Sequence, residues 1–252
     1  MKYTNLRVGL LVIIMSFLTA CATFDDMIGQ DGQDVQDTNV KPEQSVVETP
    51  VQAVTVDPVT AHALLLKSQN NQYLLSKAEV SNSIRARFVE ALDLKQQKEY
   101  QRAKEIFLSL TESQTNLSGP WVQLAEISQL QEQNSFAKNA QSEQIKTYLQ
   151  QAIKANPANY FAHNRLGSVL RMEGDFAQAK NHYLLAIKSW PGFAPAYLNL
   201  GILDDLYIGD KNQALENYLL YQALIEKPER KVKGWIADLS RQLKEQKSEV
   251  AK

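Results

Sequence analysis

The chain has 252 residues, of which 44% are hydrophobic and 22% charged, and its net charge is −1. This length and composition suffice for one domain of ordinary size with extensions. Nucleic-acid binding usually needs a dense basic surface, so the charge balance argues against such a partner. The single cysteine, Cys21, excludes an intrachain disulfide.

The first 21 residues have the pattern of a secretion signal. Two basic residues precede an apolar run at 8–18. This run is too short to span about 30 Å of hydrocarbon, but it is long enough for the core of a signal peptide. It ends in Leu18-Thr19-Ala20-Cys21, which resembles a bacterial lipobox. The resemblance implies that 1–20 is a lipoprotein signal peptide. An ordinary signal peptide or a short inner-membrane anchor with an incidental cysteine is the alternative.

The lipobox resemblance also implies a location. Cys21 would carry palmitate and further acyl chains, and several chains together anchor a protein stably to a membrane. Ala22, rather than Asp, follows the cysteine. In this it is similar to lipoproteins that enteric bacteria sort to the outer membrane. The sequence therefore predicts a lipid-anchored envelope protein at the outer membrane, facing the periplasm.

Residues 21–57 are expected to form a disordered acidic tether behind the lipidated cysteine. Residues 22–57 hold eight acidic side chains against one lysine, and they lack helical or strand periodicity. Such a segment buries too little apolar surface to offset its chain entropy. As a flexible coil its end-to-end distance averages roughly 30–35 Å.

The segment 58–83 is expected to contain an N-terminal capping helix. Apolar residues recur at helical spacing over Val59–Lys77, and Thr60 can cap the start. We expect this helix to pack on the first of the repeats that follow it.

A repeated pattern organises the rest of the chain. Leu166-Gly167 returns 34 residues later as Leu200-Gly201, and Gly174-Asp175 returns 35 residues later as Gly209-Asp210. A helix-pair repeat of this length resembles the tetratricopeptide repeat (TPR). The resemblance implies an all-α solenoid of stacked antiparallel helix pairs.

Phasing from this pattern gives four TPR units at 84–117, 118–159, 160–193 and 194–228. Ala91 and Ala125 take the place of Gly167, where a small side chain lets the two helices of a pair approach. The second unit has about eight extra residues around 132–143, which we expect on a loop between its helices. The fourth unit has one extra residue before Gly209.

Residues 229–252 are expected to form a C-terminal capping helix and tail. The helix has one apolar face and several basic residues elsewhere, with the apolar face made by Trp235, Ile236, Leu239 and Leu243. A solubilising cap fits this pattern. A basic helix lying on a membrane surface is the alternative.

Nothing in the sequence indicates catalysis. The three histidines, His62, His163 and His182, have no metal-ligand spacing, and no phosphate-binding loop or nucleophile elbow occurs. We therefore predict no enzyme activity, no cofactor, no metal and no small-molecule substrate. Asp204 is interpreted either as part of a distorted helix end or as an acid that faces a ligand.

The TPR resemblance also implies a binding groove, lined by the first helix of each unit. The third unit is the strongest candidate for peptide binding, because it combines cations with amides that can hold a peptide. The candidate partner-binding residues there and in the fourth unit are Phe161, Asn164, Arg165, Ser168, Arg171, Leu198, Asn199 and Ile202. They do not reproduce the carboxylate clamp of chaperone-binding TPR domains. A solvated groove with incidental arginines is the alternative.

Together these features predict a non-enzymatic, lipid-anchored periplasmic adaptor that binds a peptide or helix of a protein partner. The architecture resembles TPR lipoproteins that act as pilotins for type IV pilus secretins. It also resembles those that recruit peptidoglycan enzymes and those that accompany TonB-type systems. The alternative is a self-associating structural protein of the envelope.

Overall fold

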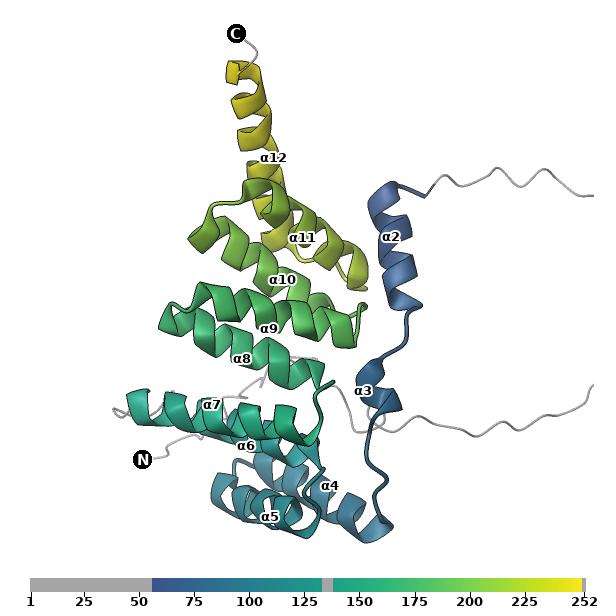
Figure 1. Cartoon of the computed structure of the whole chain (residues 1–252), viewed down its shortest axis with the longest axis vertical. Helices are drawn as coiled ribbons and strands as arrows, with labels where there is room; N and C mark the ends of the chain where they lie inside the picture. The colour runs from purple at the N-terminus through teal and green to yellow at the C-terminus, as the bar shows by residue number, and fades with distance from the viewer. Residues whose placement is uncertain (1–55, 133–137, 251–252) are drawn as a thin grey trace, which may run out of the picture. The chain divides into compact units, whose positions relative to one another are not determined.

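The computed structural model describes residues 56–132 and 138–250 (Figure 1). The described residues contain helices and no strand, so the predicted all-α class is confirmed. The predictions for the signal peptide, Cys21 and nearly all of the tether fall outside the described residues. The helices are α2 (Pro58–Lys67), α3 (Gln72–Leu75), α4 (Asn82–Gln96), α5 (Tyr100–Ser113), α6 (Ser118–Glu132), α7 (Lys138–Ala155), α8 (Tyr160–Glu173), α9 (Phe176–Ser189), α10 (Ala194–Leu203), the π-helix η1 (Asp204–Ile208), α11 (Lys211–Leu224) and α12 (Arg230–Val250).

Helices α4 to α11 form four consecutive pairs that stack one on the next. Within the pairs, α4 packs on α5, α6 on α7, α8 on α9 and α10 on α11. Between pairs, α5 contacts α6, α7 contacts α8 and α9 contacts α10, as Figure 1 shows. Each pair buries its apolar stripe on its neighbours, which is the packing expected of a solenoid of helical repeats.

A glycine in the first helix of two pairs allows the close approach of the second helix. A Cβ atom added at Gly167 would lie 2.7 Å from the ring of Tyr183, and one at Gly201 would lie 2.5 Å from the ring of Tyr218. Both tyrosines are fully buried. In each of these two pairs, a tyrosine ring of the second helix therefore packs directly against the backbone of the first helix at the glycine.

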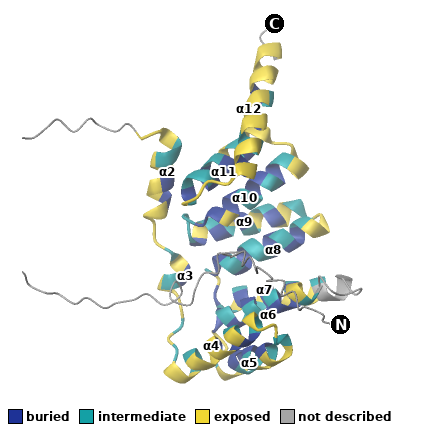
Figure 2. Cartoon of the chain, turned by 180° about the vertical axis from the view of Figure 1, so that it is seen from behind, coloured by how far each residue is buried: buried dark blue, intermediate teal, exposed yellow. Residues whose placement is uncertain are grey.

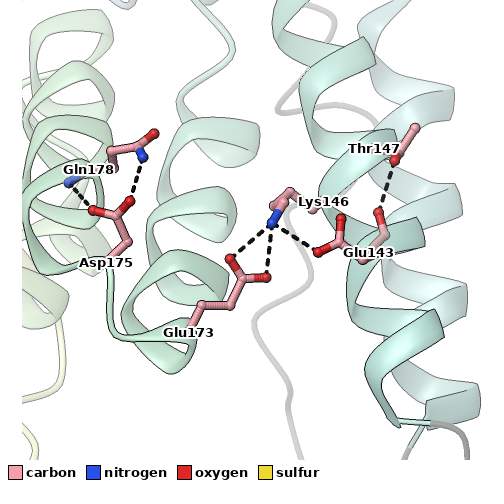
Figure 3. A network of polar contacts seen from close by, with 6 residues as sticks. All are labelled: Glu143, Lys146, Thr147, Glu173, Asp175 and Gln178. Carbon is pink, nitrogen blue, oxygen red and sulfur yellow. Dashed lines mark hydrogen bonds and ion pairs between the residues drawn. The ribbon is translucent and has the colours of Figure 1, made fainter.

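Matching signals end the first helix of a pair and begin the second. Gly174 and Gly209 both have a φ of +85°, a left-handed conformation that glycine adopts without strain. The next residue in each case caps the following helix. The carboxylate of Asp175 accepts a hydrogen bond of 3.1 Å from the Gln178 backbone N–H (Figure 3), and Asp210 caps α11 in the same way.

The extra residue of the fourth unit is absorbed by the π-helix η1. The Gly209 N–H donates to the carbonyl of Asp204, five residues earlier, at 2.8 Å. A single wide turn of this kind accommodates one inserted residue without breaking the helix. The interpretation of Asp204 as part of a distorted helix end is therefore confirmed. Its side chain is fully buried and accepts hydrogen bonds from Lys180 at 2.9 Å and from Asn217 at 3.1 Å.

The insertion in the second unit mostly lengthens helices. Helix α7 has 18 residues where α9 has 14, and α6 has 15 where α8 has 14. The prediction of a loop over 132–143 is therefore wrong for 138–143, which open α7; residues 133–137 lie outside the described ones. No glycine or proline interrupts 138–143, so the helix continues. Lys146 ties this extension to α8, since its ammonium binds Glu143 and Glu173 at 3.1 and 3.0 Å (Figure 3).

The N-terminal segment does not cap the first unit as expected. The single helix predicted over 59–77 is two helices, and the longer one, α2, packs against α11 in the fourth unit. Ala63 and Leu66 are its buried residues, and they join an apolar cluster with Tyr197, Tyr221 and Leu224. The apolar spacing of α2 predicted a helix correctly. The spacing alone did not determine which of several apolar surfaces the helix would cover.

After α2 the segment runs back along the stack towards the first unit. The hydroxyl of Ser118, in the second unit, donates to Tyr73 Oη at 3.1 Å. Asn156 donates to Ser76 at 3.2 Å, and the Gln114 side chain donates to the carbonyl of Glu79 at 3.0 Å. We call residues 57–81 the N-terminal strap, because they contact the fourth, second and first units in turn.

Helix α12 closes the other end of the stack. Its buried residues Val232, Leu239 and Leu243 lie along one face, and the ring of Trp235 packs 5.3 Å from that of Tyr218. The far end of α12 is exposed, as Figure 2 shows. In the described part of the chain, no helix is both long enough and apolar enough to cross a membrane.

Candidate functional site

A network of polar side chains links the first helices of three successive units. Lys95 of α4 binds Glu126 of α6 at 2.8 Å and also donates to Gln123. From α8, the guanidinium of Arg165 donates to the same Glu126 carboxylate and to Gln129, the latter at 3.0 Å. We call these five residues the polar ladder. It holds Glu126 between two cations that come from the units on either side.

The net charge of the polar ladder depends on whether Glu126 is ionised. Burial alone would raise the pKa of this carboxyl, but Arg165 and Lys95 outweigh burial and hold the pKa below its usual value. Glu126 is therefore ionised at neutral pH. With two cations around one anion, the polar ladder carries a net positive charge.

The predicted amide and hydroxyl residues lie beside the polar ladder. Asn199 of α10 donates to Asn164 of α8 at 2.9 Å, which continues the chain of contacts into the fourth unit. The hydroxyl of Ser168 donates to the carbonyl of Asn164 at 3.2 Å. The structure thus brings Asn164, Arg165, Ser168 and Asn199 together on neighbouring first helices.

The apolar residues of the predicted groove take part in packing within the third and fourth units. Phe161 lies 4.2 Å from the ring of Tyr160 and 5.4 Å from that of Phe193. Leu198 and Ile202 are half-buried against the apolar cluster of the fourth unit. All three are partly exposed, so a role in partner binding stays a prediction for them.

Arg171 lies apart from the polar ladder. Its guanidinium donates to Tyr183 Oη at 3.3 Å and stands 5.7 Å from the centre of the Tyr207 ring. Tyr207 belongs to the π-helix, so Arg171 links the third unit to the distorted end of α10. This contact could not be predicted from the sequence, because it depends on the path of the chain around the inserted residue.

A cavity of about 130 Å³ opens next to Arg165, between the second and third units. Arg165, Gln129 and Ser168 supply its polar wall. Its apolar wall consists of Ala125, Ile145, Leu149, Val169 and Met172. Met172 is 72% exposed and therefore stands at the rim. The cavity was not predicted, since it depends on how α6, α7 and α8 meet.

Two histidines whose spacing in the sequence does not fit a metal site are hydrogen-bonded to each other in the structure. His163 Nε2 lies 3.0 Å from the carbonyl of Pro157, so this nitrogen carries the proton. His163 Nδ1 must then accept from His182 Nδ1, which lies 2.9 Å away. Burial lowers the pKa of both rings, that of His182 to about 4 with the help of His163. Both are neutral at physiological pH, and the pair joins α8 to α9.

Across residues 56–132 and 138–250, no three histidine, cysteine, aspartate or glutamate side chains are grouped to hold a metal ion.

Comparison with known proteins gives information at the level of the fold. No protein-family model matches the chain, and no curated protein matches it. Among solved structures, PilF of Pseudomonas aeruginosa aligns with a TM-score of 0.53 at 19% identity, over 64% of this chain and 69% of PilF. TTC0263, a TPR protein of Thermus thermophilus, aligns with a TM-score of 0.52 at 17% identity, over 72% and 90%.

MamA of Desulfovibrio magneticus aligns with a TM-score of 0.51 at 15% identity, over 68% of this chain and 90% of MamA. These likenesses agree with the 34-residue period, the four stacked helix pairs and the glycine–tyrosine contacts within two of them. The chain has the fold of the tetratricopeptide-repeat proteins.

Proposed function

We propose that the chain is a non-enzymatic adaptor that holds a protein partner against the first helices of its repeats. The observation that carries the proposal is the cavity beside Arg165, where a cationic, hydrogen-bonding wall meets an apolar one. Concave sites with an apolar lining and a few polar groups are typical of ligand binding.

The chemistry of this surface suits a peptide or one face of a helix. Arg165 offers a planar cation for a carboxylate, and Asn164 and Asn199 offer amides for a peptide backbone. The apolar wall of the cavity accepts a side chain. A partner is thus recognised by three kinds of contact, supplied by α6, α7, α8 and α10.

Charge reversal at Arg165 is expected to release the partner. Arg165→Glu should lower partner capture from a cell extract by about tenfold, because a carboxylate would meet Glu126 and repel an acidic ligand. The matched control is Arg102→Glu, a charge reversal at an exposed arginine of α5 that pairs with Glu99. Both variants should melt within a few degrees of the natural protein. Equal capture by the two variants would mean that the surface around Arg165 is not the binding site.

We further propose that this adaptor is held at the bacterial outer membrane, facing the periplasm, through lipid on Cys21. The lipobox resemblance supports this. Cys21→Ser is expected to remove palmitate labelling and to move the protein from the membrane fraction to the soluble fraction. Unchanged labelling of the serine variant would overturn the proposed anchor but leave the adaptor role intact. An anchored adaptor could serve assembly of a pilus or secretion secretin, a peptidoglycan enzyme or a TonB-type system.

One observation favours the alternative of a self-associating structural protein. Three consecutive apolar residues of the π-helix are exposed, Leu206 by 67%, Tyr207 by 46% and Ile208 by 45%. Exposed apolar patches often mark interfaces. Light scattering decides between the two functions: an adaptor that acts alone stays monomeric as its concentration rises, whereas self-association raises the measured mass.

A further inference from the structure

Glu126 holds Arg165 in the position where a ligand carboxylate would bind. Its carboxylate accepts a hydrogen bond from one guanidinium nitrogen of Arg165, and the side-chain carbonyl oxygen of Gln129 accepts one from another. The side chain of Arg165 is nevertheless 35% exposed, compared with 24% for Glu126 and 17% for Lys95. A molecule that enters the cavity therefore meets Arg165 before the other two charges.

The polar ladder allows this contact to be exchanged at little cost. A charged carboxylate that loses its only partner in a half-buried place is strongly destabilised. Glu126 does not face this penalty, because Lys95 still binds it at 2.8 Å when Arg165 turns away. The contrast is Asp204, which is fully buried and pairs with one cation among the described residues, Lys180. The Arg165–Glu126 pair is thus built to open, and the Lys180–Asp204 pair is not.

The residues next to Arg165 on α8 determine which groups lie beside a ligand carboxylate that binds Arg165. Arg165, Val169 and Met172 are spaced four and three residues apart, so they share one face of the helix. All three line the cavity. Arg165 is the only charged residue among the cavity-lining side chains of the described chain. A group bound there must pair a negative charge with an adjacent apolar side chain.

From these contacts we propose that Glu126 is an internal competitor for Arg165, and that the ligand displacing it is a peptide segment with a carboxylate beside an apolar side chain. The inference rests on the proposed binding function and names its chemistry. It makes Glu126 a specificity-determining residue. Cationic or neutral segments cannot replace Glu126 as the ion-pair partner of Arg165. An acidic segment replaces the Glu126 carboxylate with its own, and its apolar side chain fills the cavity.

The test uses two small probes that differ in one charge. N-acetylleucine has a carboxylate beside a leucine side chain, and N-acetylleucinamide is its neutral counterpart. Binding is followed by the NMR signal of the Met172 methyl group in the full chain carrying Cys21→Ser. That signal is assigned by its loss in Met172→Leu. The chain has four methionines, of which Met172 alone lies in the described part.

N-acetylleucine is expected to shift the Met172 signal at a concentration about tenfold lower than N-acetylleucinamide. Glu126→Gln should lower the half-saturating concentration of N-acetylleucine a further three- to fivefold, about the worth of a partly exposed ion pair, and leave that of the amide unchanged. Arg165→Gln should make the two probes equal. Glutamine at 126 can still accept a hydrogen bond from Lys95, so its thermal stability serves as the folding control.

Equal shifts with both probes, the absence of any shift, or an unchanged half-saturation in Glu126→Gln would each overturn the inference. Failure of the proposed function has a different signature, namely partner capture that survives Arg165→Glu. Capture that is lost in Arg165→Glu but not improved in Glu126→Gln would retain the adaptor and reject the internal competitor.

Discussion

Gly201→Ala is expected to destabilise the fold by about 2–3 kcal/mol, the range in which overpacking a tight core falls. The new Cβ atom would lie 2.5 Å from two ring carbons of Tyr218, and that ring is buried and also packs against Trp235. The intrinsic helix propensity of alanine, about 1 kcal/mol better than that of glycine, offsets only part of this cost. Urea denaturation monitored by circular dichroism gives the change in unfolding free energy.

Gly234→Ala in α12 is the matched control for this prediction. It is the same substitution within a helix, but the added Cβ would meet no atom within 4 Å apart from its chain neighbours and the backbone of its own helix. It should leave stability unchanged or raise it by up to about 1 kcal/mol. The double variant Gly201→Ala with Tyr218→Leu should be less destabilised than the sum of its single variants, because the ring that causes the clash is gone. If Gly201→Ala behaved like Gly234→Ala, the two helices would not depend on a bare backbone for their contact.

Lys180→Met is expected to cost about 3 kcal/mol, and more than Asp204→Asn. The first change leaves the fully buried Asp204 carboxylate with Asn217 as its partner among the side chains described, and an unpaired buried charge is severely destabilising. The second leaves Lys180, which is 37% exposed and can reach water, so it should cost about 1–2 kcal/mol. Thermal or urea unfolding of both variants measures the difference.

The order of the two costs is the informative result. If Asp204→Asn were the more damaging change, the carboxylate would matter through its hydrogen bonds to α11 rather than through its charge. The double variant, with Lys180→Met and Asp204→Asn, should recover part of the loss seen in Lys180→Met alone, since it removes the unpaired charge.

The repeat architecture could be predicted because its signals are local and recur. Gly167 with Tyr183 and Gly201 with Tyr218 each pair a small with a large residue, 16 and 17 residues apart along the chain. The glycines and aspartates that separate the paired helices do the same. These features act within a single helix pair, so a 34-residue period in the sequence was sufficient to identify it.

The position of α2 and the lengthened α7 could not be predicted in the same way. Ala63 and Leu66 need an apolar surface, and several repeats offer one. The choice of α11 depends on which surface is left uncovered after the repeats have stacked. In the second unit, the polar residues of the insertion suggested a loop, but polar residues without glycine or proline can equally extend an exposed helix.

The sequence pointed to individual residues of the candidate site but not to the contacts between them. Arg165, Asn164 and Asn199 were expected in the groove, and the structure places them side by side. The link from Arg165 to Glu126 and Lys95 joins three units. It depends on the offset between neighbouring pairs and on side-chain rotamers, neither of which a single sequence shows. The same holds for the cavity and for the histidine pair.

Site-specific photo-crosslinking in living cells tests the binding proposal most directly. A photoreactive amino acid replaces Met172 at the rim of the cavity, and in a parallel strain it replaces Leu184, an apolar residue of α9 that is 49% exposed. The proposal predicts a defined protein adduct from position 172, its loss when Arg165→Glu is added, and no adduct from position 184. An adduct from position 184 with none from position 172 would contradict it.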